Sequence, residues 1–325
     1  SGGSFGSSFD ANDGSTLNIS GGEYRLDGVL IGGLETVGNM LAFNLPDGSV
    51  LSGTLADGTP FAFASLDSDN IDPNTLTLIA AAIAPVGPAV ITLPSDPAPL
   101  GIRTGQTLVV DNGGILGDNF NAGWGSVVEV NAGGQVGNNL EAVGAQVTIS
   151  GGSVGNDFDA YSGSVVNISG GSVGDDFQAS NGSEVNLFGI QFVLDGSDVT
   201  ASLTIGAPFT ITDRNVTLNG LLADGSPFSF DLNSTNVSGQ DYFDLGALLT
   251  VTLVGPGDFD GNLVVDGADF LRWQRGQSPN PLSALDLTAW EDNYGMGGAL
   301  LSSEAAAVPE PSSLLLLATG ITRCC

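Results

Sequence analysis

The residues with the clearest chemistry lie in a twelve-residue segment near the C-terminus, at 258–269, with the sequence DFDGNLVVDGAD. Carboxylates and one amide occupy positions 1, 3, 5, 9 and 12 of this segment, and position 7 can contribute a backbone carbonyl. Ca²⁺ is a hard cation that takes about six to eight oxygen ligands, and a loop with this spacing supplies them. The sequence therefore predicts one calcium site with the following ligands: Asp258, Asp260, Asn262, the carbonyl of Val264, Asp266 directly or through water, and Asp269.

Position 6 of the predicted loop departs from what such a site favours. The chain turns sharply there, and the left-handed backbone of that turn is easiest for glycine, but this chain has Leu263. A non-glycine residue in that conformation costs roughly 1–2 kcal/mol, which corresponds to about a tenfold loss of affinity. We therefore expect weak binding, in the millimolar range of extracellular calcium modules.

Two short helices are predicted after the loop. Residues 269–273 (DFLRW) are repeated in spacing by residues 286–290 (DLTAW), so each helix presents an apolar face. The expected core of this small unit, residues 255–297, consists of Phe270, Trp273, Leu287, Trp290 and Tyr294. Because so small a core seldom stabilises a fold unaided, we expect the unit to depend on bound metal.

The loop and the duplicated helix together resemble a dockerin type I domain, of the degenerate kind found in planctomycete-like surface proteins. The resemblance covers about 255–297, and the second half of the segment has no ligand loop. It implies a calcium-binding module and a cohesin-like surface protein as a partner.

The C-terminal tail carries a second motif. Val308, Pro309, Glu310 and Pro311 are followed by the apolar stretch 314–321. The tail resembles the PEP-CTERM sorting signal, which implies export and processing by an exosortase-type enzyme in a bacterium. Departures from that signal are the short apolar stretch, which is below the length of a membrane span, a single arginine in place of a basic cluster, and two terminal cysteines, Cys324 and Cys325.

The elements before the loop are predicted from internal repeats. Copies of a glycine-rich motif begin at Gly113, Gly133, Gly151 and Gly170, which are 20, 18 and 19 residues apart, and short alternating runs lie between them. Aligning the copies gives three apolar columns: Leu116, Val136, Val154 and Val173; Phe120, Leu140, Phe158 and Phe177; and Val130, Ile149, Ile168 and Leu187. Such columns favour all-β repeat modules of the parallel β-helix type, with a β-sandwich as the alternative.

Within each copy, the motif Gly-[Asp/Asn]-[Asp/Asn]-[Phe/Leu] has two interpretations. Its stacked polar residues can coordinate cations or contact a polysaccharide, or they can serve as turn residues that stack on one another. The turn interpretation is favoured because the polar residues recur with every coil.

A longer duplication sets the predicted domain boundaries. Residues 1–28 match 169–196, and residues 51–63 match 218–230. The predicted organisation has five parts: 1–79, the C-terminal part of a first β-repeat module; 80–102, a Pro/Ala-rich linker; 103–254, a second module with coils at 105–188 and capping strands at 189–254; 255–297, the dockerin-like module; and 298–325, the sorting tail. The chain begins inside a repeat without an initiator Met or a signal peptide, so we expect a fragment or a processed chain.

Composition narrows the function. The chain has 6 Lys+Arg, all of them arginine, against 36 Asp+Glu, a net charge of −30 that disfavours nucleic acid as a partner. It contains no histidine, which removes the usual near-neutral base and the His-dependent nucleophiles. With no acidic cluster outside the repeats, we expect no enzymatic activity.

The sequence thus predicts a secreted or cell-surface bacterial protein with a structural or adhesive role in the extracellular matrix, and polysaccharide is one candidate partner. The alternatives are a β-helix carbohydrate-active enzyme and a cohesin-binding assembly component. Ice binding is disfavoured because no flat Thr-x-Thr ladder repeats with the coils.

Overall fold

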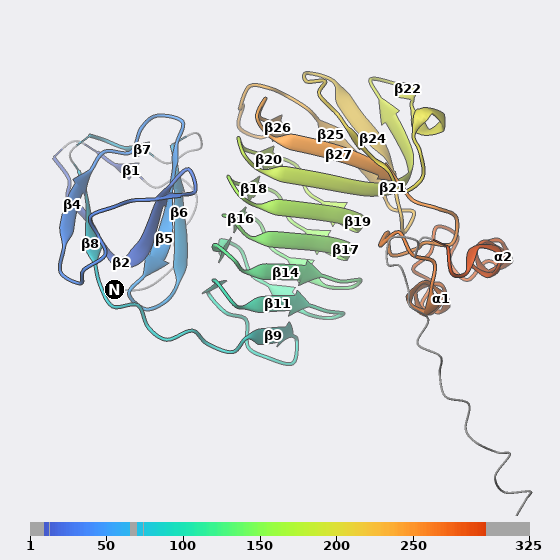
Figure 1. Cartoon of the computed structure of the whole chain (residues 1–325), viewed down its shortest axis with the longest axis horizontal. Helices are drawn as coiled ribbons and strands as arrows, with labels where there is room; N and C mark the ends of the chain where they lie inside the picture. The colour runs from blue at the N-terminus through green and yellow to red at the C-terminus, as the bar shows by residue number, and fades with distance from the viewer. Residues whose placement is uncertain (1–9, 13, 66–69, 74, 297–325) are drawn as a thin grey trace, which may run out of the picture.

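The computed structural model of the chain describes residues 10–12, 14–65, 70–73 and 75–296 (Figure 1). The predicted sorting motif at 308–311 and the two cysteines lie outside these residues. The described chain is nearly all β, with a parallel β-solenoid of about five turns and a small module of two α-helices. The predicted fold class is confirmed, and the β-sandwich alternative is not what forms.

Two parallel ladders build the solenoid. The longer ladder contains β9 (Val90–Leu93), β11 (Thr107–Val110), β14 (Val127–Val130), β17 (Gln146–Val154), β19 (Val165–Val173), β21 (Glu184–Leu194) and β27 (Leu248–Leu253). The shorter one contains β10 (Gly101–Ile102), β13 (Phe120–Ala122), β16 (Leu140–Ala142), β18 (Phe158–Ala160), β20 (Gln178–Ala179) and β26 (Tyr242–Phe243). A third pairing joins β12 (Ile115–Leu116) to β15 (Gln135–Val136). Each strand is in register with the same position of the next repeat, as in Val128 opposite Val147.

The first coil comes from the proline-rich segment predicted as a linker, because β9 and β10 both lie within 80–102. The outer edge of β9 is closed by its own chain. Asp96 accepts a hydrogen bond from the Thr92 N–H through its side chain (2.8 Å) and donates its own N–H to the Thr92 carbonyl (2.8 Å). Such pairing removes polar groups that an open edge strand would otherwise offer to another strand.

Interior side chains follow the predicted apolar columns. Phe158 and Phe177 are 0% exposed, and their ring centroids lie 5.1 Å apart. Every other member of the three columns is buried as well, apart from Val173, which is half-buried. Full burial of such side chains contributes about 1.5–3 kcal/mol each, so the stack of columns is the main source of stability for the coils.

The polar motif residues form the turns between coils. The second of the two polar positions in the motif has a left-handed backbone in all four copies: Asn119, Asn139, Asp157 and Asp176. At the first position, side chains bond to the next coil, as where Asp118 accepts from the Asn138 N–H at 2.8 Å and Asn138 from the Asn156 N–H at 2.9 Å. This is the turn-forming role that the composition of the motif favours.

A cap closes the last coil. It contains β22 (Ser197–Asp198), a 3-10 helix at Thr200–Ser202, β23 (Pro208–Thr210), β24 (Thr217–Leu222) and β25 (Pro227–Asp231). β24 and β22 pair antiparallel with β21, and β23 pairs antiparallel with β27. The rings of Phe230 and Phe243 lie 5.3 and 5.5 Å from Phe177, so the aromatic column continues into the cap.

The N-terminal unit repeats the pairing of the cap. Its strands are β1 (Asp10–Ala11), β2 (Leu17–Leu26), β3 (Val29–Leu30), β4 (Met40–Phe43), β5 (Val50–Leu55), β6 (Pro60–Ala64), β7 (Asn70–Ile71) and β8 (Leu76–Ala80). β2 pairs with β8 in parallel and with β5 antiparallel, and β5 forms a hairpin with β6. The unit has its own core, which includes Phe61, Phe63 and Leu78.

This unit lies beside the shorter ladder of the solenoid (Figure 1). Val50, Ala62 and Ala64 form an apolar cluster with Val143 and Tyr161 of the coils, and Trp124 packs against it. The guanidinium of Arg25 lies 4.5 Å from the centre of the Trp124 ring. The contact joins residues more than sixty positions apart in sequence into one interface.

The two helices are α1 (Gly267–Gln274) and α2 (Ala284–Asn293), on the opposite side of the solenoid from the N-terminal unit (Figure 1). Arg272 of α1 donates from Nη1 to the Ser150 carbonyl at 2.8 Å. Gly261 lies so close to the coils that a Cβ there would be 2.8 Å from the Ser169 Cβ. The helical module is therefore packed against the solenoid. Within the described ranges, no helix has the length and apolarity needed to cross a membrane.

Candidate metal centre

Three carboxylates of the predicted calcium loop come together at the start of α1. Oxygen atoms of Asp258, Asp260 and Asp269 all lie within 4.8 Å of one another. Asp258 and Asp269 are 3% and 0% exposed, and Asp260 is half-buried. They are brought together by the segment that connects β27 to the first turn of α1. This group of three can hold a metal ion.

Backbone N–H groups fix the orientation of the two buried carboxylates. Asp258 accepts hydrogen bonds from Gly261 (2.8 Å) and Leu263 (2.9 Å). Asp269 accepts from Phe259 (2.7 Å), Asp260 (3.1 Å) and Asp266 (2.8 Å). A carboxylate offers about four lone-pair sites, so these bonds leave capacity for a cation while fixing where it would bind.

Leu263 has the left-handed backbone expected at position 6, with φ of +68°. This conformation aims its N–H at Asp258. The strain predicted for a non-glycine residue is therefore present in the folded loop.

The other predicted ligands lie around this group. Asn262 accepts from the Val264 N–H at 2.8 Å and donates from its amide to Asp260 at 3.2 Å. Asp266 caps α1 by accepting from the Ala268 N–H at 2.6 Å, and its side chain is not one of the three converging carboxylates. Asp266 therefore positions the helix start, and three of the four predicted carboxylates converge.

The electrostatics of the site are those of crowded anions. Burial, together with the charges of Asp269 and Asp260, raises the pKa of Asp258 to about 7. Burial and the charge of Asp260 raise the pKa of Asp269 to about 6. The pKa of Asp260 is also raised by burial, although the nearby charge of Arg272 opposes that shift. A divalent cation would relieve both the repulsion and the desolvation.

In the second half of the module, the carboxylate at the start of the helix is hydrogen-bonded to an asparagine. Asp286, at the start of α2, corresponds to Asp269, and it accepts hydrogen bonds from the backbone N–H (2.7 Å) and the side-chain amide (3.1 Å) of Asn280. An amide donor therefore satisfies this carboxylate. Asn280 has no counterpart in the predicted site, and its place before Pro281, where a turn is favoured, is the sequence signal for it.

The module's core differs in part from the prediction. The Phe270 ring packs against Trp290 and Trp273, with ring centroids 4.8 and 5.6 Å apart. These three side chains and Leu287 are only half-buried, and Tyr294 is 62% exposed. Two loop residues that the helix pattern did not identify, Phe259 and Val265, are 4% exposed. Val265 also pairs by backbone with the segment after α2, donating to the Met296 carbonyl at 2.9 Å. The core therefore extends from the helices into the loop.

The fold and the site define a β-solenoid protein whose helical module presents an acidic loop able to hold a cation. Compared with models of protein families, with curated proteins and with solved structures, the chain shows no match.

Proposed function

We propose that this chain is an exported structural or adhesive protein of a bacterial surface, in which the loop at 258–269 binds one Ca²⁺. The observation that carries the proposal is the convergence of Asp258, Asp260 and Asp269 within 4.8 Å in a largely buried loop. Three carboxylates in such a site favour a divalent ion, and an all-oxygen donor set favours a hard one.

The solenoid supports the structural part of the proposal. Its coils are stabilised by uniform apolar columns, and their repeated acids and amides are used in turns. A β-solenoid is compatible with a surface or carbohydrate-binding protein. Export is proposed from the resemblance of the tail to a sorting signal, with an exosortase-type enzyme as the processing partner.

The enzyme alternative finds little support in an acidic pair on the shorter ladder of the solenoid. Glu141 and Asp159 are neighbours on β16 and β18, but they are 8% and 2% exposed on the side that faces the N-terminal unit. A glycosidase needs both carboxylates in contact with substrate. We therefore propose binding without catalysis.

A cohesin-like protein is the second candidate partner, and exposed apolar side chains on the helices favour it. Leu271 of α1 and Leu285 of α2 are 47% and 71% exposed. In saturating calcium, an immobilised cohesin domain should retain the whole chain and lose it when both leucines are changed to Ala. Equal retention of the two proteins, or none of either, would remove this candidate.

Calorimetric titration of the whole chain with CaCl₂ tests the metal site. We expect one site with a millimolar dissociation constant, which disappears in the double variant Asp258→Asn, Asp260→Asn. Leu263→Gly should bind about tenfold more tightly because it removes the left-handed strain.

The matched control is Asp118→Asn, which removes one exposed carboxylate from a turn of the solenoid. It should bind calcium like the unmodified chain. If calcium gives no heat, or if the control and the double variant lose binding equally, the loop is not the site.

A further inference from the structure

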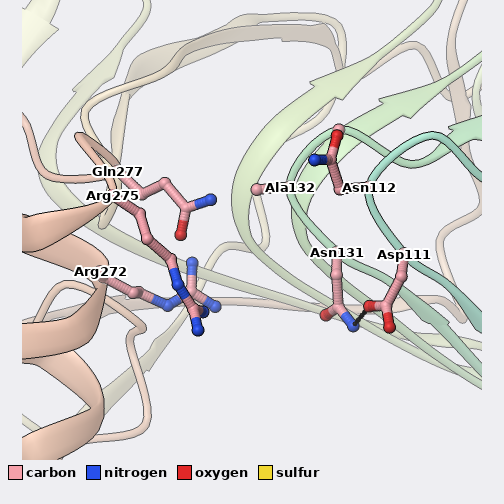
Figure 2. A pocket seen from close by; sticks show the side chains of 8 residues that line it. Asp111, Asn112, Asn131, Ala132, Arg272, Arg275 and Gln277 are labelled. Atoms are coloured by element: carbon pink, nitrogen blue, oxygen red, sulfur yellow. Dashed lines mark hydrogen bonds between the residues drawn. The ribbon is translucent and has the colours of Figure 1, made fainter.

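We propose that a groove between α1 and the turns of the solenoid binds a saccharide chain that carries a carboxylate. Figure 2 shows the two walls of the groove. One consists of Arg272, Arg275 and Gln277, at the end of α1 and just after it, and the other includes Asp111 and Asn131 from successive coils. Its volume, about 840 Å³, falls within the range of about 300–1,000 Å³ typical of ligand sites.

Arg275 is the available cation of this groove. Among the arginines in the described part of the chain, Arg25, Arg103, Arg214 and Arg272 each donate to backbone carbonyls. The exposed guanidinium of Arg275 makes no such bond and faces the groove (Figure 2). A free guanidinium presents paired N–H groups that match a carboxylate in geometry.

Arg272 is the second cation of the groove, and its guanidinium is held in place by a hydrogen bond. Its Nη1 is held by the Ser150 carbonyl at 2.8 Å, and its side chain is half-buried. Two positive charges therefore line one wall, against the single carboxylate of Asp111, which is itself bonded to the amide of Asn131 at 2.7 Å. The lining is net positive in a chain whose net charge is −30.

The groove continues along the coils. A second cleft of about 560 Å³ shares Ala132, Arg272 and Gln277 with the first, and its lining includes Asp224 and Ser226 from the cap hairpin. Glycines of successive turns, Gly133 in the first cleft and Gly151 and Gly171 in the second, form part of the wall. Because the two clefts are contiguous, they suit an extended ligand better than a compact one.

The polar groups along this path match a sugar chain. The amides of Asn112 and Gln277 can both donate and accept, and Asp111 can accept from a hydroxyl group with the oxygen that is not bonded to Asn131. The net charge of the protein disfavours a densely charged polyanion. At physiological salt the Debye length is about 8 Å, so distant charges are screened and the charges lining the groove determine whether one carboxylate binds. The ligand class is therefore a saccharide with isolated carboxylates between neutral sugars.

This inference deepens the proposed function by naming a ligand class, and the two can fail separately. Calcium binding is measured at the loop without sugar, whereas sugar binding to the groove is measured at a fixed calcium concentration and again in EDTA.

The test uses the whole chain and a glucuronate–N-acetylglucosamine tetrasaccharide, titrated by calorimetry in 2 arms: about 2 mM CaCl₂ and EDTA. We expect binding in calcium that falls about tenfold or more in Arg275→Gln and for the carboxyl-reduced tetrasaccharide. Arg275→Lys keeps the charge but loses the paired donors, so its affinity for the tetrasaccharide should lie between those of the unmodified chain and Arg275→Gln.

Ser197→Asp in the cap is the charge-matched control, because it adds one negative charge on an exposed residue that is not among the groove's lining residues. It should bind like the unmodified chain, and all variants should keep the same calcium binding and unfolding temperature. Equal binding of the charged and reduced sugars, no effect of Arg275→Gln, or no binding at millimolar sugar would each overturn the proposal. Binding in calcium that disappears in EDTA while Arg275→Gln has no effect would assign the sugar to the metal loop and overturn it too.

Discussion

Residues 17–80 and 184–253 are two copies of one β unit, and they differ in what lies beside their first strand. In the second copy, β21 pairs in parallel with β27 on one side and with β19 of the coils on the other. In the first copy, β2 pairs with β8 in the same way, but none of the described strands occupies the place of β19. The first strand of the second copy is therefore shared with the coils, whereas the described part of the first copy has its own core and pairing pattern.

The hairpins of the two copies also serve different contacts. In the first copy, Pro60 of the β5–β6 hairpin packs so close to the coils that a Cβ on Gly101 would lie 2.8 Å from its ring. In the second, Gly225 of the β24–β25 turn approaches Pro279 of the helical module, and a Cβ there would lie 2.6 Å from the Pro279 Cα. One hairpin type thus docks a unit on each side of the solenoid.

The largest effect is expected in the coil stack. Phe158→Ala should lower the free energy of unfolding by about 3–5 kcal/mol, because the ring is fully buried between coils. Urea unfolding followed by circular dichroism measures this. Phe209→Ala, at a position 53% exposed in the cap, should change stability by less than about 0.5 kcal/mol. Similar losses in both variants would contradict the buried column.

A second comparison is between the carboxylates at the starts of the two helices: Asp269 lies in the acidic loop, whereas Asp286 is hydrogen-bonded to the amide of Asn280. Calcium competes with protons at Asp258 and Asp269, whose pKa values are raised to about 7 and about 6. The calcium association constant should therefore fall at least about tenfold between pH 7.5 and pH 5.5. Calorimetry at the two pH values measures it, and an unchanged constant would exclude these carboxylates as ligands.

Without calcium, the stability of the protein should fall, not rise, as the pH increases. A carboxyl group whose pKa is raised on folding stabilises the protein below its unfolded pKa of about 4, and this contribution is lost as pH rises through about 6 and 7. In EDTA, unfolding followed by tryptophan emission should thus occur at lower urea at pH 8 than at pH 5. Saturating calcium at pH 8 should restore the lost stability.

A smaller effect distinguishes the cores of the two copies. Tyr24 occupies the place of Phe192, and its one hydroxyl proton is shared between the Ile19 and Ile79 carbonyls, which lie 2.8 and 2.9 Å from the hydroxyl oxygen. Tyr24→Phe should cost about 0.5–1.5 kcal/mol, measured by urea unfolding. Tyr294→Phe, at a position 62% exposed, is the control and should be neutral. A neutral Tyr24→Phe would mean that the hydroxyl adds nothing to the first copy.

The smallest effect concerns the interface between the first copy and the coils. Replacing Arg25 by Gln removes a cation from the face of Trp124, a contact worth about 0.5–1 kcal/mol. Limited proteolysis should then cut the 80–89 connection faster, with little change in the stability of the coils. Unchanged cleavage would show that the apolar cluster alone holds the interface.

Sequence periodicity was sufficient to predict the coils, because each coil repeats its apolar columns against the next. In the loop, the spacing of the acids was enough to predict that Asp258, Asp260 and Asp269 lie close together and that Leu263 has a left-handed backbone, because both are local properties. The first coil was hidden by the prolines around β9, whose pairing with β11 depends on residues in another repeat.

The packing of the N-terminal unit and the helical module against the solenoid could not be predicted, because it depends on which outer surfaces of the three parts come into contact. The large side chains of Val143 and Tyr161, where the next copy has Ser180, were the available signal for a covered face. Arg272 and Arg275 gave no comparable signal. Their groove exists only because the helical module packs against turns more than 130 residues earlier in the chain.

The central claim is that Asp258, Asp260 and Asp269 form one calcium site. A crystal structure of the chain grown in millimolar CaCl₂, with anomalous data collected where calcium scatters, tests it most directly. We expect a single strong anomalous peak between these three carboxylates, with ligand distances of about 2.3–2.6 Å. Strong calcium peaks elsewhere in the molecule, with none in the loop, would contradict it.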